Sequence, residues 1–203
     1  MKNRKAVVKR KTKETDITVK LNIDGKGNCK INTGIGFLDH MLELFAFHGL
    51  FDLEITAKGD LKVDIHHTNE DIGIVLGEAF KQALGDKKGI KRSANVSWPM
   101  EDVIASVVVD ISGRGFFKGI TFEPAGQTST TDKDGYAFSY ANHFFEAFAK
   151  KMGIDLSIKL SSSNPDLHTN LEPVFKALGK ALDEATQIDP RRKGIPSTKG
   201  VID

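Results

Sequence analysis

The sequence predicts an α+β protein made by tandem duplication, in which each half is rich in β-strands and carries two helices. Two observations lead to this fold class. Segments with the periods of strands and of helices follow one another in the same order twice. A pattern of histidine and glutamate also recurs about a hundred residues along the chain. The composition is that of an ordinary globular protein, and 203 residues suffice for a substantial core.

Five segments alternate apolar and polar residues, the pattern of a strand that buries one face. Turn residues follow two of them, at Asp24-Gly25 and at Lys58-Gly59-Asp60. The predicted strands are Ile17–Ile23, Leu53–Ala57 and Leu61–Ile65 in the first half, and Ala105–Ile111 and Ile154–Leu160 in the second.

Four segments repeat their apolar residues at helical spacing. They are Phe37–His48 and Ile72–Ala83 in the first half, and Phe138–Met152 and Val174–Leu182 in the second. The last helices of the two halves align from their glutamates, because Glu70 and Glu172 are each followed seven residues later by a glycine, Gly77 and Gly179.

The two halves are expected to pack as one unit, because neither has enough sheet and helix to fold alone. We therefore predict a single domain over residues 1–203, with repeats at about 5–92 and 93–190. Residues 191–203 form a polar tail that we expect to be a loop. Its segment Pro196–Gly200 offers hydroxyls, a lysine and flexible backbone, which together suit a phosphate.

Histidines carry the strongest functional signal. Five of the six histidines fall at positions that match between the halves, each time with a glutamate nearby, and only His48 lies outside this pattern. The offset is 103 residues from His40 to His143 and 102 residues from Glu70 to Glu172. Imidazole suits zinc, iron, nickel and manganese, and added carboxylates favour the harder ions. The sequence therefore predicts a paired metal site across a pseudo-twofold axis.

Simpler interpretations remain open for several of these residues. His66 and His67 would point to opposite faces if they lie on a strand, and would then serve two different ions. Thr68 to Asp71 and Thr169 to Glu172 fit a helix capping box, which would account for Asp71 and Glu172 without a metal. His48 shares a helical stripe with core residues, so it either packs there or touches substrate.

Other functional classes are excluded by simple features. The apolar runs are short and broken by charge, which argues against a membrane span. No apolar segment follows the basic start, so a secretory signal is not expected. Cys29 is the single cysteine, which favours a reducing, cytoplasmic setting. The net charge of +2 gives no reason to expect nucleic acid as a partner.

The chain closely resembles the imidazoleglycerol-phosphate dehydratase family, essentially from end to end. The motifs that carry the resemblance are residues 36–42, 48–52, 66–71, 89–92, 112–114, 172 with 175–177, and 195–200. The resemblance implies a fold of the ribosomal protein S5 domain 2-like type. It also implies two Mn²⁺ ions per active site, bound between subunits of a homo-oligomer of 24 chains.

The resemblance also implies the site residues. One ion would be held by His40, His67, His168 and Glu172, and the other by His66, Glu70 and His143. The implied reaction is the dehydration of imidazole glycerol phosphate to imidazole acetol phosphate in histidine biosynthesis, with no organic cofactor. Glu14 and Glu172 are the candidates for proton transfer. The remaining residues expected to contact the phosphorylated imidazole substrate are His48, Arg92, Arg114, Lys176, Ser197, Thr198 and Lys199.

The chain departs from the family pattern at Thr169, where the family has a histidine that would complete the second ion. Asp166 or water would take that place, or else Thr169 simply caps the helix that begins near Asn170. Two alternatives to the dehydratase therefore stay open. One is a metal-stabilised paralogue without dehydratase activity, and the other is a different metal-dependent enzyme on the same scaffold, such as a hydrolase.

Overall fold

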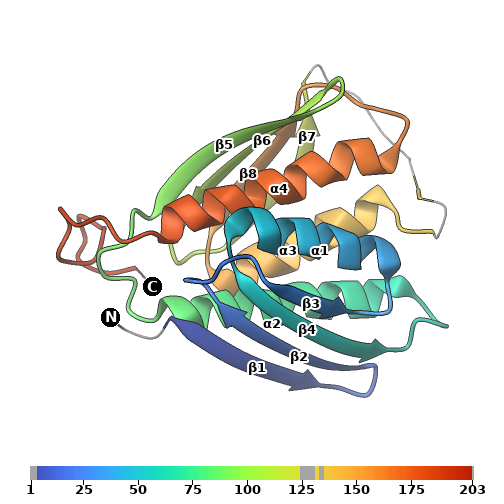
Figure 1. The fold of residues 1–203 in the computed structure, drawn as a ribbon, viewed down its shortest axis with the longest axis horizontal. Helices are drawn as coiled ribbons and strands as arrows, with labels where there is room; N and C mark the ends of the chain where they lie inside the picture. Colours follow the sequence, from blue (N-terminus) through green and yellow to red (C-terminus); the bar gives the residue numbers. More distant parts are fainter. Residues whose placement is uncertain (1–3, 124–130, 133–134, 203) are drawn as a thin grey trace.

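The computed structural model describes residues 4–123, 131–132 and 135–202. It confirms the predicted duplication, because each half contains a four-stranded sheet and two helices (Figure 1). The elements of the first half are β1 (Lys5–Lys11), β2 (Thr15–Asn22), β3 (Cys29–Asn32), α1 (Gly36–Gly49), β4 (Asp52–Gly59) and α2 (Ile65–Leu84). Those of the second are β5 (Ser93–Met100), β6 (Val103–Asp110), β7 (Phe116–Phe122), α3 (Phe138–Met152), β8 (Asp155–Leu160) and α4 (Leu167–Thr186).

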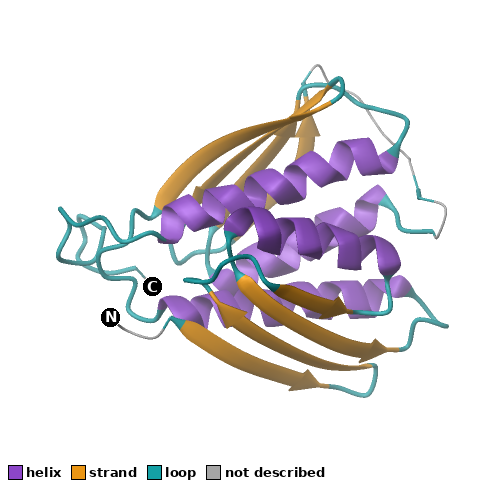
Figure 2. Ribbon diagram, in the orientation of Figure 1, coloured by secondary structure: helices purple, strands orange, loops and turns teal. Residues whose placement is uncertain are grey.

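The two sheets have the same topology. The strand orders are β1-β2-β4-β3 and β5-β6-β8-β7, and in each sheet only the last pair is parallel. Figure 2 shows the four helices lying between the sheets, so that one face of each sheet is buried against them. All four helices begin at the same side of the molecule, on the right in Figure 1. That shared side is where the histidines of the two halves come together.

Helices of different halves pack against each other, α2 on α3 and α1 on α4. Glycines allow the close approach. A Cβ on Gly77 of α2 would lie 2.7 Å from the carbonyl oxygen of Phe148, and a Cβ on Gly179 of α4 would collide with the carbonyl oxygen of Phe45. The matched glycines of the sequence therefore mark two equivalent helix crossings. Among the described residues, no helix is both long enough and apolar enough to span a membrane.

The predicted strand Leu61–Ile65 is wrong. β4 ends at Gly59, a turn follows, and α2 begins at Ile65. The Asp64 side chain accepts a hydrogen bond from the backbone N–H of His66 at 3.0 Å and so caps the helix. Val63 is 75% exposed, which shows that its apolar side chain was no sign of a buried strand. His66 and His67 therefore lie in the first turn of a helix, and the strand-borne interpretation of this pair is also wrong.

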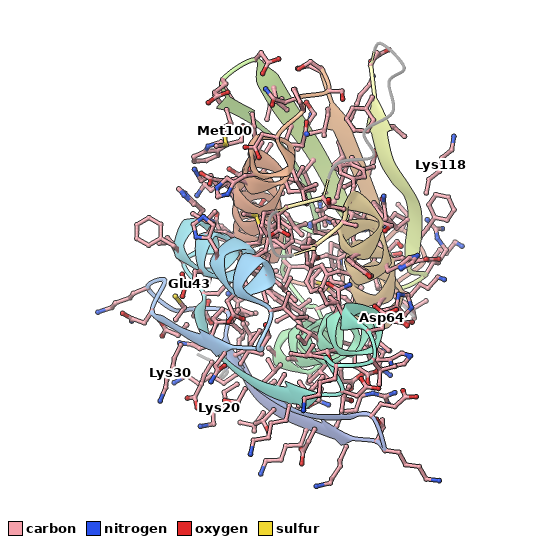
Figure 3. All side chains as sticks on the ribbon, turned by 90° about the vertical axis from the view of Figure 1, so that its right-hand side faces the viewer. Lys20, Lys30, Glu43, Asp64, Met100 and Lys118 are labelled. Carbon is pink, nitrogen blue, oxygen red and sulfur yellow. The ribbon has the colours of Figure 1, made fainter. Side chains whose placement is uncertain are left out.

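The predicted capping residues need the same correction. Asp64 and Asp166 are the N-caps of α2 and α4, so neither Thr68 nor Thr169 caps a helix. Both helices consequently start seven residues before the predicted Ile72 and Val174. Figure 3 views the side at which the helices begin, with Asp64 at the start of α2 and with Lys20 and Lys30 on the outward face of the first sheet. The extra helical turns carry most of the predicted metal ligands.

Candidate metal and substrate site

Three predicted ligands converge where α1 packs against α4. We call His40, His168 and Glu172 the α1–α4 group. His168 and Glu172 are one helical turn apart on α4, and their Nε2 and Oε2 atoms are 2.5 Å apart. His40 comes from α1, and its Nε2 lies 3.6 Å from the same Oε2 atom. One ligand atom from each of the three residues lies within 4.8 Å of the others.

The Glu172 carboxylate is held in its charged form. Burial raises the pKa of Glu172, but hydrogen bonds from Lys176 and His168 outweigh burial and leave the pKa below its usual value. Lys176 donates to Oε1, the oxygen that does not face the histidines. The group therefore presents one anionic oxygen and two imidazole nitrogens at a common point, which is the donor set of a divalent transition-metal site.

A second set of predicted ligands lies where α2 packs against α3. We call His66, Glu70 and His143 the α2–α3 group. The Nδ1 atoms of His66 and His143 are 3.0 Å apart, and Nε2 of His66 lies 3.4 Å from Oε2 of Glu70. The group is the pseudo-symmetric counterpart of the α1–α4 group, and it too draws on one helix from each half. Its three members do not converge on one point, however, because His143 lies at Nδ1 of His66 and Glu70 lies at Nε2.

His67 belongs to neither group within the chain. Its Nδ1 lies 3.1 Å from Oδ2 of Asp60, and its side chain is 34% exposed. The hydrogen bond with Asp60 is the largest cause that raises the pKa of His67, and the nearby charge of Glu14 adds to it. The backbone carbonyl of Glu14 accepts from the N–H of Asp60 at 3.1 Å, so Glu14 and His67 lie beside each other. A carboxylate on one ring nitrogen, with the other nitrogen outward, is the usual setting of a metal-binding histidine.

Aromatic rings separate the two groups inside the chain. Phe37 meets His168 edge-on at 5.9 Å and stacks on Tyr136 at 4.9 Å between ring centroids. Tyr136 adjoins Tyr140, whose hydroxyl donates to Asp64 at 3.0 Å, next to His66. This row of rings therefore runs from His168 of the α1–α4 group to Asp64, beside the α2–α3 group.

The predicted phosphate residues include Arg92, which anchors the tail. Its guanidinium binds both carboxylate oxygens of Asp110, at 2.6 and 2.9 Å, and donates to the carbonyl of Pro196 at 2.9 Å. The next residue, Ser197, accepts from the backbone N–H of Lys199 at 3.2 Å through its side chain. Arg92 therefore shapes the loop that carries Ser197, Thr198 and Lys199.

Arg92 and the tail lie far from the α1–α4 group, whereas Lys176, which was also expected to bind the phosphate, contacts Glu172 within that group. The N–H of Arg92 donates to the carbonyl of Ala185, near the end of α4. Thirteen residues of helix separate Ala185 from Glu172, about 20 Å at the rise of an α-helix. Arg114 pairs with Asp155 at 2.7 Å and is 70% exposed in its side chain. The tail and the helix starts occupy opposite ends of the molecule in Figure 1.

His48 lies along α1 from His40, and it contacts a residue that was not predicted to belong to the site. Its ring meets the indole of Trp98, on β5, at 4.8 Å. Burial lowers the pKa of His48, and the charge of Lys176 lowers it further. Two other site residues, Asp60 and Tyr136, were also not predicted. The aspartate at the turn before a His-His pair was the one available signal for Asp60.

Comparisons with known proteins identify the family of the chain. Residues 33–182 match the imidazoleglycerol-phosphate dehydratase family. The protein of that name from Thermoanaerobacter sp. is 54% identical, over 98% of this chain and 100% of the relative, and that from Methanocella arvoryzae is 52% identical over the same shares.

Solved structures give the same result. The crystal structure of the enzyme from Pyrococcus furiosus has a TM-score of 0.79 and 36% identity, covering 96% of this chain and 99% of that one. The structure of the dehydratase from Staphylococcus aureus has a TM-score of 0.75 and 33% identity, covering 91% and 100%. The chain therefore belongs to the imidazoleglycerol-phosphate dehydratase family of enzymes.

Proposed function

We propose that the chain is a metal-dependent hydro-lyase that converts imidazole glycerol phosphate to imidazole acetol phosphate in histidine biosynthesis. The observation that carries the proposal is the convergence of His40, His168 and Glu172 on one point, in a member of this family. The reaction breaks one carbon–hydrogen and one carbon–oxygen bond, releases water, and leaves an enol that rearranges to a ketone. No net oxidation occurs, so no organic redox cofactor is needed.

The α1–α4 group fits a divalent ion, because it combines two imidazoles with a carboxylate held in its charged form. A bound Mn²⁺ would act as a Lewis acid toward an imidazole nitrogen of the substrate. Lys176 holds the second oxygen of Glu172, which leaves Oε2 directed at the two histidines. His40, His168 and Glu172 would thus hold the ion, with Lys176 fixing the orientation of the carboxylate.

We propose that a second copy of the chain completes the site. His67 is partly exposed beside Asp60, and it is not part of the α1–α4 group of its own chain. Arg92 and the tail of one chain are about a helix length from that group, further than a small phosphorylated imidazole can span. Both features suit a homo-oligomer in which His67 and Glu14 of one copy face the α1–α4 group of another, and the family resemblance suggests 24 chains.

Glu14 is the better placed of the two glutamates for proton transfer. Both oxygens of Glu172 are engaged, Oε1 by Lys176 and Oε2 by the histidines. Glu14 is exposed at the turn between β1 and β2, beside His67. A carboxylate that is free to face a neighbouring subunit can take up and return a proton, whereas a metal-bound carboxylate is poorly suited to do so.

Ser197, Thr198, Lys199 and Arg114 would bind the substrate phosphate by charge-assisted hydrogen bonds. Arg92 shapes the loop through Pro196 and presents part of its guanidinium there. His48 would line the path between phosphate and metal, supported by Trp98.

The test is turnover of imidazole glycerol phosphate by the purified protein, with and without Mn²⁺, measured as formation of imidazole acetol phosphate. We expect activity that needs Mn²⁺ and that falls at least about 100-fold in Glu14→Gln, the range of a positioned acid or base. Lys13→Gln, which changes the neighbouring charge, is the matched control and should retain activity. A protein that binds Mn²⁺ and assembles but gives no product would contradict the proposal and favour a metal-stabilised paralogue. Release of inorganic phosphate would favour a hydrolase.

A further inference from the structure

The internal repeat pairs each residue of the α2 start with one of the α4 start. Asp64 corresponds to Asp166, His66 to His168, and Glu70 to Glu172, each at an offset of 102 residues. At the same offset, His67 corresponds to Thr169. Under the proposed function, His67 of one copy supplies the missing ligand of the α1–α4 group in a neighbouring copy. By the same symmetry, Thr169 would have to supply the missing ligand of the α2–α3 group.

Thr169 is turned inward. It is 3% exposed, and its hydroxyl donates to Oδ2 of Asp166 at 3.0 Å. His67, by comparison, is 34% exposed and leaves one ring nitrogen free of its contact with Asp60. The Thr169 hydroxyl is therefore bound to Asp166, the N-cap residue of its own helix, and is not accessible to a partner chain.

Asp166 does not replace the missing ligand. Its two carboxylate oxygens accept from the N–H groups of His168 and Thr169 at 3.3 and 3.2 Å, besides the Thr169 hydroxyl. These bonds satisfy the free N–H groups at the start of α4. Coordination of a metal by Asp166 would break the cap, so the expectation that Asp166 completes the second ion does not agree with the structure.

The geometry of the α2–α3 group also indicates that, without a fourth ligand, it holds an ion less well than the α1–α4 group. Its contacts use opposite nitrogens of His66, with His143 at Nδ1 and Glu70 at Nε2. An ion bound by one nitrogen of His66 would therefore lie away from one of the other two residues. Among the described residues, only the α1–α4 group brings three ligand atoms within 4.8 Å of one another.

We infer that this chain binds one metal ion per protomer, at the α1–α4 group, and that its α2–α3 group has lost the capacity to hold a second ion tightly because Thr169 closes the fourth ligand position. The inference rests on the proposed function, since it assumes that the α1–α4 group binds metal.

The test is a count of bound Mn²⁺ in the full-length assembled protein after equilibrium dialysis, by elemental analysis and by electron paramagnetic resonance of free Mn²⁺. We expect one tight Mn²⁺ per chain in the parent protein, and the same count after His143→Ala. Thr169→His should bind a second Mn²⁺, and adding His143→Ala to Thr169→His should remove it. Thr169→Val removes the hydroxyl without adding a ligand, so it is the matched control and should bind one ion.

Two ions of similar affinity in the parent protein would overturn the inference and leave the proposed metal-dependent function intact. So would a count that falls when His143 is replaced in the parent. If the parent protein binds no Mn²⁺ tightly, both the single-ion inference and the proposed metal-dependent function are wrong. If Thr169→His does not fold, the counts for the parent and for His143→Ala decide the matter by themselves.

Discussion

The first turns of α2 and α4 have the same plan and different outcomes. Each begins with an aspartate that accepts from the N–H two residues later, and each places a histidine and a glutamate one turn apart. In α2 the next residue, His67, contacts Asp60 outside its own helix and is 34% exposed. In α4 it is Thr169, which folds back onto its own cap. Both helices therefore keep the aspartate that caps them, but only α2 keeps a metal-binding side chain at the position that follows the first histidine.

A second pair of positions extends the comparison. The Asp71 carboxylate of α2 accepts hydrogen bonds from the Thr15 hydroxyl at 2.6 Å and from the Arg10 guanidinium at 2.9 Å. These bonds connect the helix to the β1–β2 hairpin that carries Glu14. The counterpart of Asp71 in α4 is Pro173, which can make neither bond and lacks a backbone N–H. The start of α2 is thus fastened to the turn beside His67, while α4 has no such link at the matching position. This agrees with α2 being the helix that supplies ligands to a neighbouring copy.

The largest expected effect comes from the matched glutamates. Glu172→Gln removes the charged oxygen that both histidines face, and we expect Mn²⁺ affinity to fall at least about 100-fold, more than the loss from a residue that only supports a ligand. Glu70→Gln, at the equivalent position, should change the affinity of the tight site only slightly. Manganese titration of both variants checks this. Equal losses in the two variants would show that both groups bind metal alike.

The next effect concerns the support of His67. Asp60→Ala removes the carboxylate that orients the imidazole, and a loss of about 10–100-fold in Mn²⁺ affinity of the assembled protein is expected. In a protein that already carries His67→Ala, adding Asp60→Ala should not lower the Mn²⁺ affinity any further. An additional loss in that background would mean that Asp60 acts on the metal by another route.

The helix crossings should be equally sensitive in the two halves. Gly77→Ala and Gly179→Ala each place a Cβ against the backbone of the partner helix, and each should lower the free energy of unfolding by about 1–3 kcal/mol. Gly194→Ala, at an open loop position, is the control. Chemical denaturation measures the differences. A loss confined to one glycine would show that the packing symmetry is weaker than the structure indicates.

The smallest effect separates capping from metal binding. Asp166→Ala should cost about 1 kcal/mol through loss of the cap, a shift of roughly 2–4 °C in Tm for a chain of this size. Its Mn²⁺ count and affinity should not change. Weaker metal binding in Asp166→Ala, without the lower Tm, would make Asp166 a ligand and contradict the comparison of α2 with α4.

Sequence periodicity predicted the duplication, the positions of α1 and α3, and the central strands, because these elements bury one regular face. It missed the four edge strands, β1, β3, β5 and β7. In β1, for example, Lys5, Val7 and Lys9 are exposed. It also extended a strand through Val63 to Ile65, because alternation persists across a turn that the Asp64 cap converts into a helix start. Boundaries set by one side-chain hydrogen bond do not show in an apolar pattern.

The residues of the candidate site also fall into those that the sequence predicted and those that only the structure revealed. The repeat selected five of the six histidines, the hydroxyls and the lysine of Pro196–Gly200 indicated a phosphate, and the family resemblance added Glu14, Arg92 and Arg114. Asp60 and Trp98 were not predicted, because their contacts join residues distant in sequence or in a turn. The contrast between His67 and Thr169 also needed the structure, since only the direction of each side chain shows which is presented outward.

We propose that α2 of one copy completes the α1–α4 group of another, and mixing of two variant chains tests this claim. His67→Ala and Glu172→Gln should each be inactive alone. They are purified separately, stripped of metal, mixed in equal amounts and reassembled with Mn²⁺. Because each site would draw on two copies, random mixing should restore about a quarter of the parent activity. Activity that stays at the level of the separate variants, in assemblies shown to contain both chains, would contradict the claim.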